Sequence, residues 1–234
     1  MKILITGGSG LLGKYLIAEL EKQNIDYYAP NSQKLNVHNL DSCLLEINTT
    51  YKPDIVIHCA AIAKYRDVED NPLTAVKTNV VGTCNVLHAC MVDNIKMIYI
   101  SSDHVFDGQD GPYNINDKIR PLTKYAKTKA AGELVVQMYE NSLIVRTSFC
   151  PEKFPFDTAY TDKWTSQDYV DKVAPMIIEK AISSSTGICH IGHKRRSFYE
   201  LAKERNINIQ SGTVKQIQKT SKVPILIDTS LEIF

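Results

Sequence analysis

The sequence predicts an α/β fold, a Rossmann-like doubly wound parallel sheet followed by a small C-terminal lobe. Three features favour this class. The chain opens with a short apolar run, a glycine-rich turn and a stretch of helical spacing, which is the order of strand, turn and helix. Apolar runs of strand length then alternate with longer helical stretches. These runs are apolar throughout, as is typical of parallel strands that are covered on both faces.

The N-terminal unit carries the most specific local pattern. Residues 2–6 are the first predicted strand, residues 12–20 have apolar positions at helical spacing, and Gly7, Gly10 and Gly13 lie in and after the turn. The first glycine permits the tight turn, the second lets the backbone approach a pyrophosphate, and the third lets the helix pack close to the strand. The helix N-terminus adds partial positive charge. We therefore expect dinucleotide contacts at Gly7, Ser9, Gly10, Leu11, Leu12 and Gly13.

The second predicted strand, residues 26–30, ends without an acidic residue. A site that prefers NAD places a carboxylate there, on the adenosine ribose. This chain instead has Ser32, Gln33 and Lys34, whose side chains can bind and neutralise a 2′-phosphate. We expect NADPH as the cofactor, with NADH tolerated and with Ser32 and Lys34 as contacts. The alternative is a solvated turn without a ligand.

The later elements continue the alternation of strands and helices. They are a helix at 40–48, a strand at 54–59, a long helix at 71–94, a strand at 97–100, a helix after Pro121, a strand at 142–147, a helix at 165–182, a strand at 187–192 and a helix at 197–206. We expect a dinucleotide-binding domain over residues 1–148, completed by about 165–192. The small lobe then comprises 149–164 and 193–234.

A hydroxyl, a phenol and an amine are grouped around the fourth strand. Ser102 follows that strand, and Tyr125 and Lys129 are four residues apart in a helical stretch, so they share one face. A phenol titrates near pH ~10, and a nearby cation lowers its pKa. Lys129 can supply that cation, which predicts Tyr125 as a proton donor and Ser102 as a donor to the same carbonyl oxygen. The alternative is a solvated Tyr–Lys pair.

Ser102 with the Tyr125-x-x-x-Lys129 pattern resembles the catalytic set of the extended short-chain dehydrogenases/reductases. The segments SSDHVFDG and GPY resemble the sugar-nucleotide branch typified by the dTDP-4-dehydrorhamnose reductase family. The glycine turn, KLNVHN, HCAAIA, RTSF and the ending PILIDTS resemble that branch too. The resemblance implies an NAD(P)H-dependent reductase of an NDP-4-keto-6-deoxysugar, in nucleotide-sugar and dTDP-rhamnose biosynthesis. Hydride goes to C4, and Tyr125 is the proton donor.

The resemblance also implies further contacts. Those with the cofactor are Asn36, Val37, Cys59, Ala60, Ala61 and Asn79, together with Tyr125 and Lys129. Asn36 stands where the family has Asp, and Asn79 where the family has an asparagine that orients the lysine. Substrate contacts are Ser102, Asp103, His104, Phe149, Lys153 and Trp164. Because a diphosphate needs cations and a base needs a stacking surface, Arg195 and Arg196 are additional candidates for the diphosphate.

Two departures from the family leave alternatives open. His104 stands where the reductases have Tyr and where epimerising relatives have an acid/base Cys. A histidine can exchange a proton alpha to a ketone, so a bifunctional epimerase/reductase is one alternative, and a simple substrate contact or packed ring is another. The segment after RTSF is short, so the substrate lobe is shortened. That favours, as a third interpretation, a non-catalytic NADP-binding regulator like a related subunit of methionine adenosyltransferase.

Composition adds limits on partners and compartment. The net charge of +1 gives no electrostatic reason to expect nucleic acid or membrane as a partner. Six scattered cysteines without paired spacing indicate reduced thiols and no metal site. With no targeting signal and an ending that resembles the family's own, we expect a complete cytoplasmic protein. The sequence leaves a homodimer open.

Overall fold

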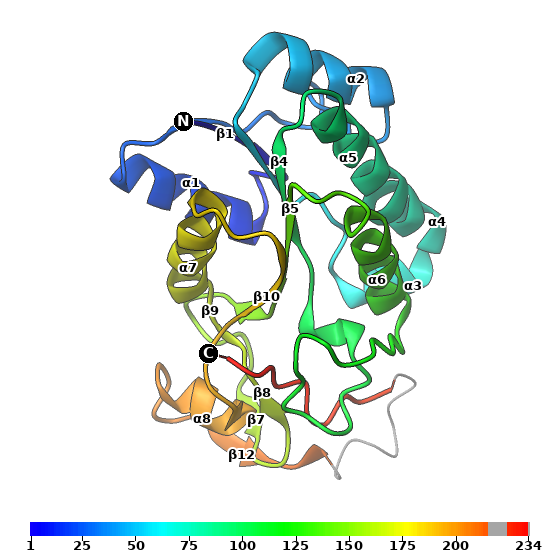
Figure 1. Ribbon diagram of the computed structural model, residues 1–234. Helices are drawn as coiled ribbons and strands as arrows, with labels where there is room; N and C mark the ends of the chain where they lie inside the picture. Colours follow the sequence, from blue (N-terminus) through cyan, green and yellow to red (C-terminus); the bar gives the residue numbers. More distant parts are fainter. Residues whose placement is uncertain (215–223, 234) are drawn as a thin grey trace.

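The computed structural model describes residues 1–214 and 224–233, and its centre is one six-stranded sheet (Figure 1). The strands are β1 (Lys2–Thr6), β2 (Asp26–Tyr28), β3 (Ile55–His58), β4 (Lys96–Ile100), β5 (Ser142–Thr147) and β10 (Gly187–Ile191). They lie in the order β10-β5-β4-β3-β1-β2, and each neighbouring pair is parallel. The predicted class, a Rossmann-like doubly wound parallel sheet, is confirmed.

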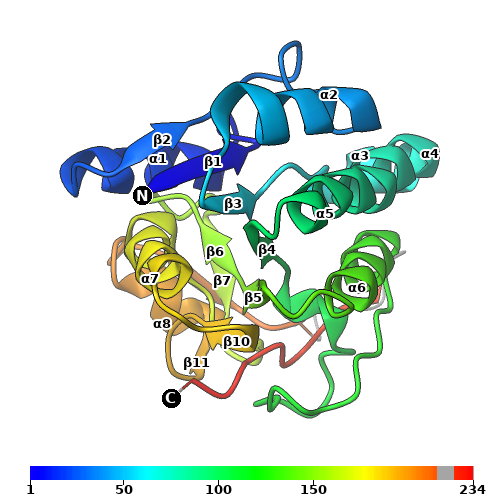
Figure 2. The same ribbon diagram turned by 45° about the horizontal axis from the view of Figure 1, so that its top comes forward.

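Helices cover both faces of this sheet. On one face lie α1 (Leu11–Lys22) and α7 (Val170–Ile182). On the other lie α2 (Leu40–Leu44), η1 (Leu45–Tyr51), α3 (Tyr65–Asp70), α4 (Pro72–Ala75), η2 (Val76–Val81), α5 (Gly82–Val92) and α6 (Lys124–Val136). Figure 2 shows α1 and α7 on one side of the strands and α2, α5 and α6 on the other.

Successive side chains of the strands pack into opposite cores. In β1, Ile3 and Ile5 join the cluster under α1 and α7, whereas Leu4 joins the cluster under α2 and α5. In β5, Val145 joins the first cluster and Ile144 the second. Because neither face is left to solvent, every position in these strands favours an apolar side chain. This explains the continuous apolar runs in the sequence.

Two helical segments are wound differently from the prediction. The helix expected at 40–48 is α2, which continues as the π-helical η1 to Tyr51. The long helix expected at 71–94 is α4, η2 and α5, with π-helical winding over Val76–Val81. A hydrophobic repeat does not distinguish an α-turn from a π-turn, and π-turns are frequent at functional sites. The second of them contains Asn79, whose contacts are described below.

The small lobe lies beyond the carboxyl edge of the sheet, directly after β5 (Figure 1). Its elements are β6 (Phe149–Cys150), β7 (Thr158–Tyr160), β8 (Trp164–Thr165), β9 (Asp168–Tyr169), β11 (Arg196–Ser197), α8 (Phe198–Lys203) and β12 (Gln210–Gly212). The last described stretch returns along the lobe and bridges Trp164 to Asp228. Within the described ranges, no helix combines the length and apolarity needed to cross a bilayer.

Candidate active site

A cavity of about 330 Å³ opens at the carboxyl edge of the sheet. It lies beside the gap between β1 and β3, where the strand order reverses, which is where ligands bind in open α/β sheets. The residues that line it come from the glycine turn, from the ends of β3, β4 and β5, and from α6. They are Gly7, Gly10, Leu11, Leu12, Gly13, Cys59, Ala61, Ala63, Ile100, Ser101, Ser102, Asp103, His104, Tyr125, Lys129, Thr147, Ser148, Phe149 and Gln167.

The glycine turn is built for a close approach of backbone segments. Gly7 has φ +73°, and a Cβ on it would lie 2.7 Å from the backbone nitrogen of Ala60. A Cβ on Gly13 would lie 2.5 Å from the carbonyl oxygen of Gly7. Gly10, the N-cap of α1, has no side chain to satisfy the first amides of that helix. These amides and the helix dipole fit a pyrophosphate.

Ser102 and Tyr125 face the same cavity from different elements. Ser102 is buried, and its Oγ donates to Asp103 Oδ1 at 3.1 Å while accepting from the backbone N–H of His104 at 3.2 Å. The ring of Tyr125 meets the ring of His104 edge to face, with 6.4 Å between centroids. Lys129, one turn after Tyr125 on α6, is buried in the same wall. The three residues expected to act together are therefore brought together.

The electrostatics of the ligand-free site differ from the prediction. Burial raises the pKa of Tyr125 to about 12, the Asp103 carboxylate adds to the rise, and the Ser102 hydroxyl opposes it. Burial lowers the pKa of Lys129 to about 7, although the nearby Cys59 and Glu133 act to raise it. The expectation that Lys129 makes the phenol more acidic is thus wrong, because the pKa of Tyr125 lies above its ordinary value. Desolvation is the largest cause of the shift for each group.

Asn79 is buried in η2, but it contacts a different partner from the one expected. Its Oδ1 accepts from the N–H of Ile62 at 2.8 Å, and its Nδ2 donates to the carbonyl of Ile62 at 3.0 Å and to Thr128 Oγ1 at 2.9 Å. No hydrogen bond between Asn79 and Lys129 is found in the described part of the chain. Asn79 therefore fixes the loop after β3 against α6, and it acts on Lys129 only through that packing.

A buried histidine supports the same loop. Thr83 Oγ1 donates to the carbonyl of Asn79 at 2.8 Å, so it accepts from Nε2 of His58 at 3.1 Å. Nδ1 of His58 then accepts from Thr6 Oγ1 at 2.7 Å, and Thr6 Oγ1 accepts from the N–H of Ala60. Burial, helped by Lys129, lowers the pKa of His58 to about 3. His58 is neutral and links β1, β3 and α5.

A buried ion pair lies behind α6. Glu133 lies one turn after Lys129. Its carboxylate accepts hydrogen bonds from Arg146 Nε at 3.1 Å, from Arg146 Nη2 at 2.9 Å and from the hydroxyl of Ser101. Both charged side chains are at most 3% exposed. Arg146 also donates to the carbonyl of Ile115. This network ties α6 to the ends of β4 and β5, the two strands that carry the active site.

The end of β5 contributes polar groups that the sequence reasoning missed. Thr147 is buried and lines the cavity, and its Oγ1 has no hydrogen-bond partner among the described residues. Beside it, Gln167 Nε2 donates to Ser148 Oγ at 3.1 Å. A buried hydroxyl without a partner is costly, and it fits a polar group of a bound cofactor. The available signal was the RTS triplet directly after a buried strand.

The expected 2′-phosphate contacts lie outside the cavity, in the turn after β2. Ser32 and Lys34 are exposed, and a Cβ on Gly8 would lie 2.9 Å from Ala29 Cβ, so this turn is adjacent to the glycine turn. Asn36 is also exposed, and its Oδ1 accepts from the N–H of His38. Val37 is part of the core under α5.

The predicted substrate contacts separate into two groups. Ser102, Asp103, His104 and Phe149 line the cavity. Lys153 is exposed and Trp164 is covered by the guanidinium of Arg195, 3.9 Å from its ring centroid. Neither lines the cavity.

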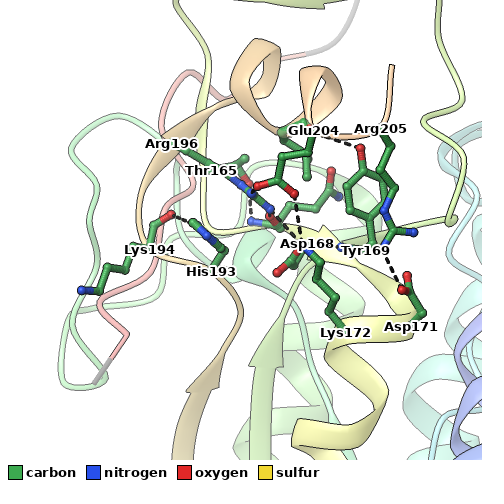
Figure 3. Close-up of polar contacts among 12 residues, drawn as sticks. Thr165, Asp168, Tyr169, Asp171, Lys172, His193, Lys194, Arg196, Glu204 and Arg205 are labelled. Atoms are coloured by element: carbon green, nitrogen blue, oxygen red, sulfur yellow. Dashed lines mark hydrogen bonds and ion pairs between the residues drawn. The ribbon is translucent and has the colours of Figure 1, made fainter. Parts of the chain in front are cut away.

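The two arginines proposed for the diphosphate are already paired. Arg195 lies 2.8 Å from the Asp228 carboxylate. Arg196 is buried and pairs with Asp168 at 2.9 Å and with Glu204 (Figure 3). A buried arginine with two carboxylates is compensated by them, so the prediction that Arg195 and Arg196 bind the diphosphate is corrected. Among the residues described, no group of His, Cys, Asp and Glu could hold a metal ion.

Comparison with known proteins agrees with this geometry. The family model described as "RmlD substrate binding domain" matches residues 1–153. Methionine adenosyltransferase 2 subunit beta from Bos taurus is 35% identical over 150 residues, which is 61% of this chain and 44% of that protein. A dTDP-4-dehydrorhamnose reductase from Aggregatibacter actinomycetemcomitans is 33% identical over 151 residues, 63% of this chain and 51% of that protein. The chain spans about half the length of these curated relatives.

Solved structures extend the likeness over the whole chain. A dTDP-4-dehydrorhamnose reductase from Clostridium acetobutylicum has a TM-score of 0.88 at 25% identity, covering 99% of this chain and 90% of that one. The enzyme of the same name from Bacillus anthracis, solved in complex with NADP, has a TM-score of 0.87 at 26% identity and covers 100% of this chain and 90% of that one.

Proposed function

Because the chain belongs to the family of the RmlD substrate binding domain, we propose that it is an NAD(P)H-dependent reductase of a nucleotide-diphosphate 4-keto-6-deoxysugar. The observation that carries the proposal is the meeting of Ser102, Tyr125 and Lys129 with the glycine turn in one cavity at the switch point of the sheet. The similarity to two dTDP-4-dehydrorhamnose reductases of known structure supports it. The reaction belongs in cytoplasmic nucleotide-sugar biosynthesis.

NADPH is the proposed cofactor, and the cavity has features that fit it. The glycine turn and the first amides of α1 would hold the pyrophosphate, Ser32 and Lys34 the 2′-phosphate, and the free hydroxyl of Thr147 the nicotinamide end. NADPH would supply the hydride. NADH would be tolerated. A preference for NADH of about tenfold or more in kcat/KM would contradict this assignment.

The residues of this chain supply the proton and hold the oxygen. Reduction of a ketone to an alcohol consumes one hydride and one proton, and Tyr125 gives its phenolic proton to the C4 oxygen. Its raised pKa keeps it protonated at neutral pH, so the donor form is the one present. Ser102 donates its hydroxyl proton to the same oxygen, in place of the hydrogen bond that it makes to Asp103 Oδ1 in the structure. Lys129 stabilises the phenolate left after transfer.

The small lobe is proposed to bind the substrate. The described parts of 149–164 and 193–234 lie beyond the carboxyl edge of the sheet, whereas 1–148 and about 165–192 provide the sheet, its helices and β9, which pairs with β6 of the lobe. His104 lines the active-site cavity at the side of this lobe. It is proposed to contact the sugar, in the position where the family has Tyr.

The test is consumption of NADPH across a panel of 4-keto-6-deoxy nucleotide sugars. We expect oxidation with at least one member of the panel and formation of the 6-deoxy sugar product. A matched reaction in deuterated water should leave C3 and C5 of the product unlabelled, since no epimerisation is proposed. Tight NADPH binding without oxidation on any member of the panel would contradict the proposal and indicate a non-catalytic, dinucleotide-binding subunit.

A further inference from the structure

Tyr99 connects the fourth strand of the sheet to α6, the helix that carries Tyr125 and Lys129. It lies in β4, and its side chain is fully buried in the core under α2 and α5. Its hydroxyl donates to the backbone carbonyl oxygen of Lys129 at 3.2 Å. The Nζ of Lys129 lies 4.0 Å from the centre of the same ring. One side chain therefore contacts both the backbone and the ammonium group of Lys129.

A glycine in the interior of α6 makes room for this ring. A Cβ on Gly132 would lie 2.1 Å from the hydroxyl oxygen of Tyr99 and 2.6 Å from its Cζ. Glycine weakens the interior of a helix relative to alanine, and the two preceding residues, Ala130 and Ala131, are alanines. Helix propensity alone would favour a third alanine here. Gly132 is therefore explained by the close approach of the Tyr99 ring to α6.

The ring is also held from the side of β3. The imidazole of His58 is stacked against it, with 6.1 Å between the ring centroids and 25° between the ring planes. His58 is itself fixed by hydrogen bonds with Thr6 and Thr83. Tyr99 thus has fixed neighbours on β3 and on α6, so its ring offers a rigid surface to Lys129.

The positive charge of Lys129 has little other compensation. Its side chain is buried, and none of the ion pairs between described residues involves it. Glu133 is the nearby carboxylate that favours the cation, but it is already paired with Arg146. A buried ammonium without a counterion is unfavourable, and the negative face of an aromatic ring attracts it. The Tyr99 ring supplies that face.

The other titratable groups beside Lys129 do not change their charge near neutral pH. Burial lowers the pKa of His58 to about 3 and raises the pKa values of Cys59 and Tyr125 to about 12. These three side chains are therefore neutral between about pH 5 and pH 9. None of them contributes to a titration of Lys129 in that range.

We propose that Tyr99 is a positioning residue for the reduction, an inference that rests on the proposed function. Its ring holds the ammonium of Lys129 at the wall of the active-site cavity and stabilises the positive charge there, and its hydroxyl fixes the turn of α6 that carries the lysine. Tyr99 is not among the residues that line this cavity. It acts on the reaction through Lys129, which stabilises the phenolate of Tyr125 after proton transfer.

The test compares Tyr99→Phe with a protein that carries trifluorophenylalanine at position 99. The two rings have nearly the same shape, but fluorine withdraws electrons and weakens the negative ring face. The titration of Lys129 is followed by NMR of its Cε atom in the full chain, and Lys129→Met identifies the signal. The same two residues at position 139 are the matched control, because Tyr139 packs against the same core and has no cation over its ring in the described part of the chain.

We expect Tyr99→Phe to titrate as the wild type does, with a pKa of Lys129 of about 7, since the ring remains. The fluorinated ring at position 99 should move the midpoint to lower pH by about half a pH unit or more, because the contact between cation and ring is weakened. The kcat/KM for NADPH reports the groups of the free enzyme. It should be nearly equal for the two proteins at pH ~5.5 and about threefold lower for the fluorinated one at pH ~8. The two proteins altered at position 139 should not differ from each other.

Equal midpoints of the Lys129 titration in the two proteins altered at position 99 would overturn the inference, since a ring that only fills the core acts through its shape. A shift of the same size from position 139 would overturn it too. Failure of the reductase proposal is a separate outcome. A lowered midpoint in a protein that reduces no ketosugar would keep the effect of Tyr99 on Lys129 and remove the reaction, whereas turnover with equal midpoints would do the opposite.

Discussion

The Nζ atom of Lys129 lies 4.0 Å from the centre of the Tyr99 ring, in the wall of the active-site cavity. The ring face is negative and favours a cation. Burial nevertheless lowers the pKa of Lys129 to about 7 from its ordinary 10.5. Lys129 is thus only partly charged near neutral pH.

Replacing Lys129 by Met should stabilise the ligand-free protein in a pH-dependent way. Between pH 7 and 10.5 the unfolded chain holds a proton on Lys129 that the folded chain has lost, so the stability of the wild type rises with pH over this window. Lys129→Met lacks this dependence. Its advantage in the free energy of unfolding should be largest at pH 7 and smaller at pH 9, measured by urea titration, while turnover falls roughly 100-fold.

A difference in the free energy of unfolding between the wild type and Lys129→Met that stays constant over that pH range would contradict the lowered pKa of Lys129. Measuring below pH 9 matters, because buried thiols such as Cys43 and Cys90 have raised pKa values and titrate above that range. A constant difference is the result expected of a lysine that stays charged in both the folded and the unfolded state.

Replacing Tyr125 by Phe should remove the proton donor and keep the cofactor site. General acid catalysis contributes about 10²–10⁴-fold, so kcat should fall by that order while the Kd of NADPH stays within about twofold of the wild type. The hydroxyl of Tyr27, which donates to Glu21 outside the cavity, provides the control, and Tyr27→Phe should be fully active. Unchanged turnover in Tyr125→Phe would remove Tyr125 from the mechanism.

Thr147 provides a test of cofactor binding without loss of a protein contact. Its Oγ1 has no partner within the described ranges, so Thr147→Val should leave the free energy of unfolding unchanged or slightly higher. If the hydroxyl binds the nicotinamide end, the Kd of NADPH should rise by about fivefold, the value of one neutral hydrogen bond. Thr147→Ser keeps the hydroxyl and should restore binding. Equal affinities for Val and Ser would argue that the hydroxyl has another role.

The sequence predicted the sheet well because the information is local. The run of residues 142–147 and the glycine turn each indicate their structure within a few residues, and burial on both faces makes the centres of the strands apolar. The meeting of Ser102 with Tyr125 also follows, since Ser102 comes after β4, Tyr125 is in the first turn of the next long helix, and the carboxyl ends of parallel strands and the N-termini of the helices that follow them lie at one edge. These parts of the site are fixed by topology.

The lobe was predicted less well because its contacts join distant segments. The sequence around Arg196 does not indicate that Asp168 and Glu204 form ion pairs with its guanidinium. Lys163 and Phe198 are 35 positions apart in the sequence but share a cavity. The charge state of Lys129 was missed for a similar reason, because a spacing of four residues shows proximity to Tyr125 but not desolvation of both groups.

Breaking the ion pair behind α6 should destabilise the protein and shift its pH profile. Glu133→Gln leaves the Arg146 charge buried without a counterion, and such a loss typically costs about 3–5 kcal/mol in the free energy of unfolding. Glu133 also raises the pKa of Lys129. The pKa of Lys129 should therefore be lower in the variant. Activity that depends on the Lys129 cation should fall to half its maximum at a lower pH than in the wild type.

The double variant Glu133→Gln/Arg146→Met separates these two effects. It removes both buried charges while keeping most of the volume, so it should recover much of the lost stability. The pH profile should stay shifted, because the carboxylate that favours the Lys129 cation is still missing. Recovery of both quantities together would show that Glu133 acts on Lys129 only by holding α6 in place, and that the charge of Glu133 is irrelevant to the lysine.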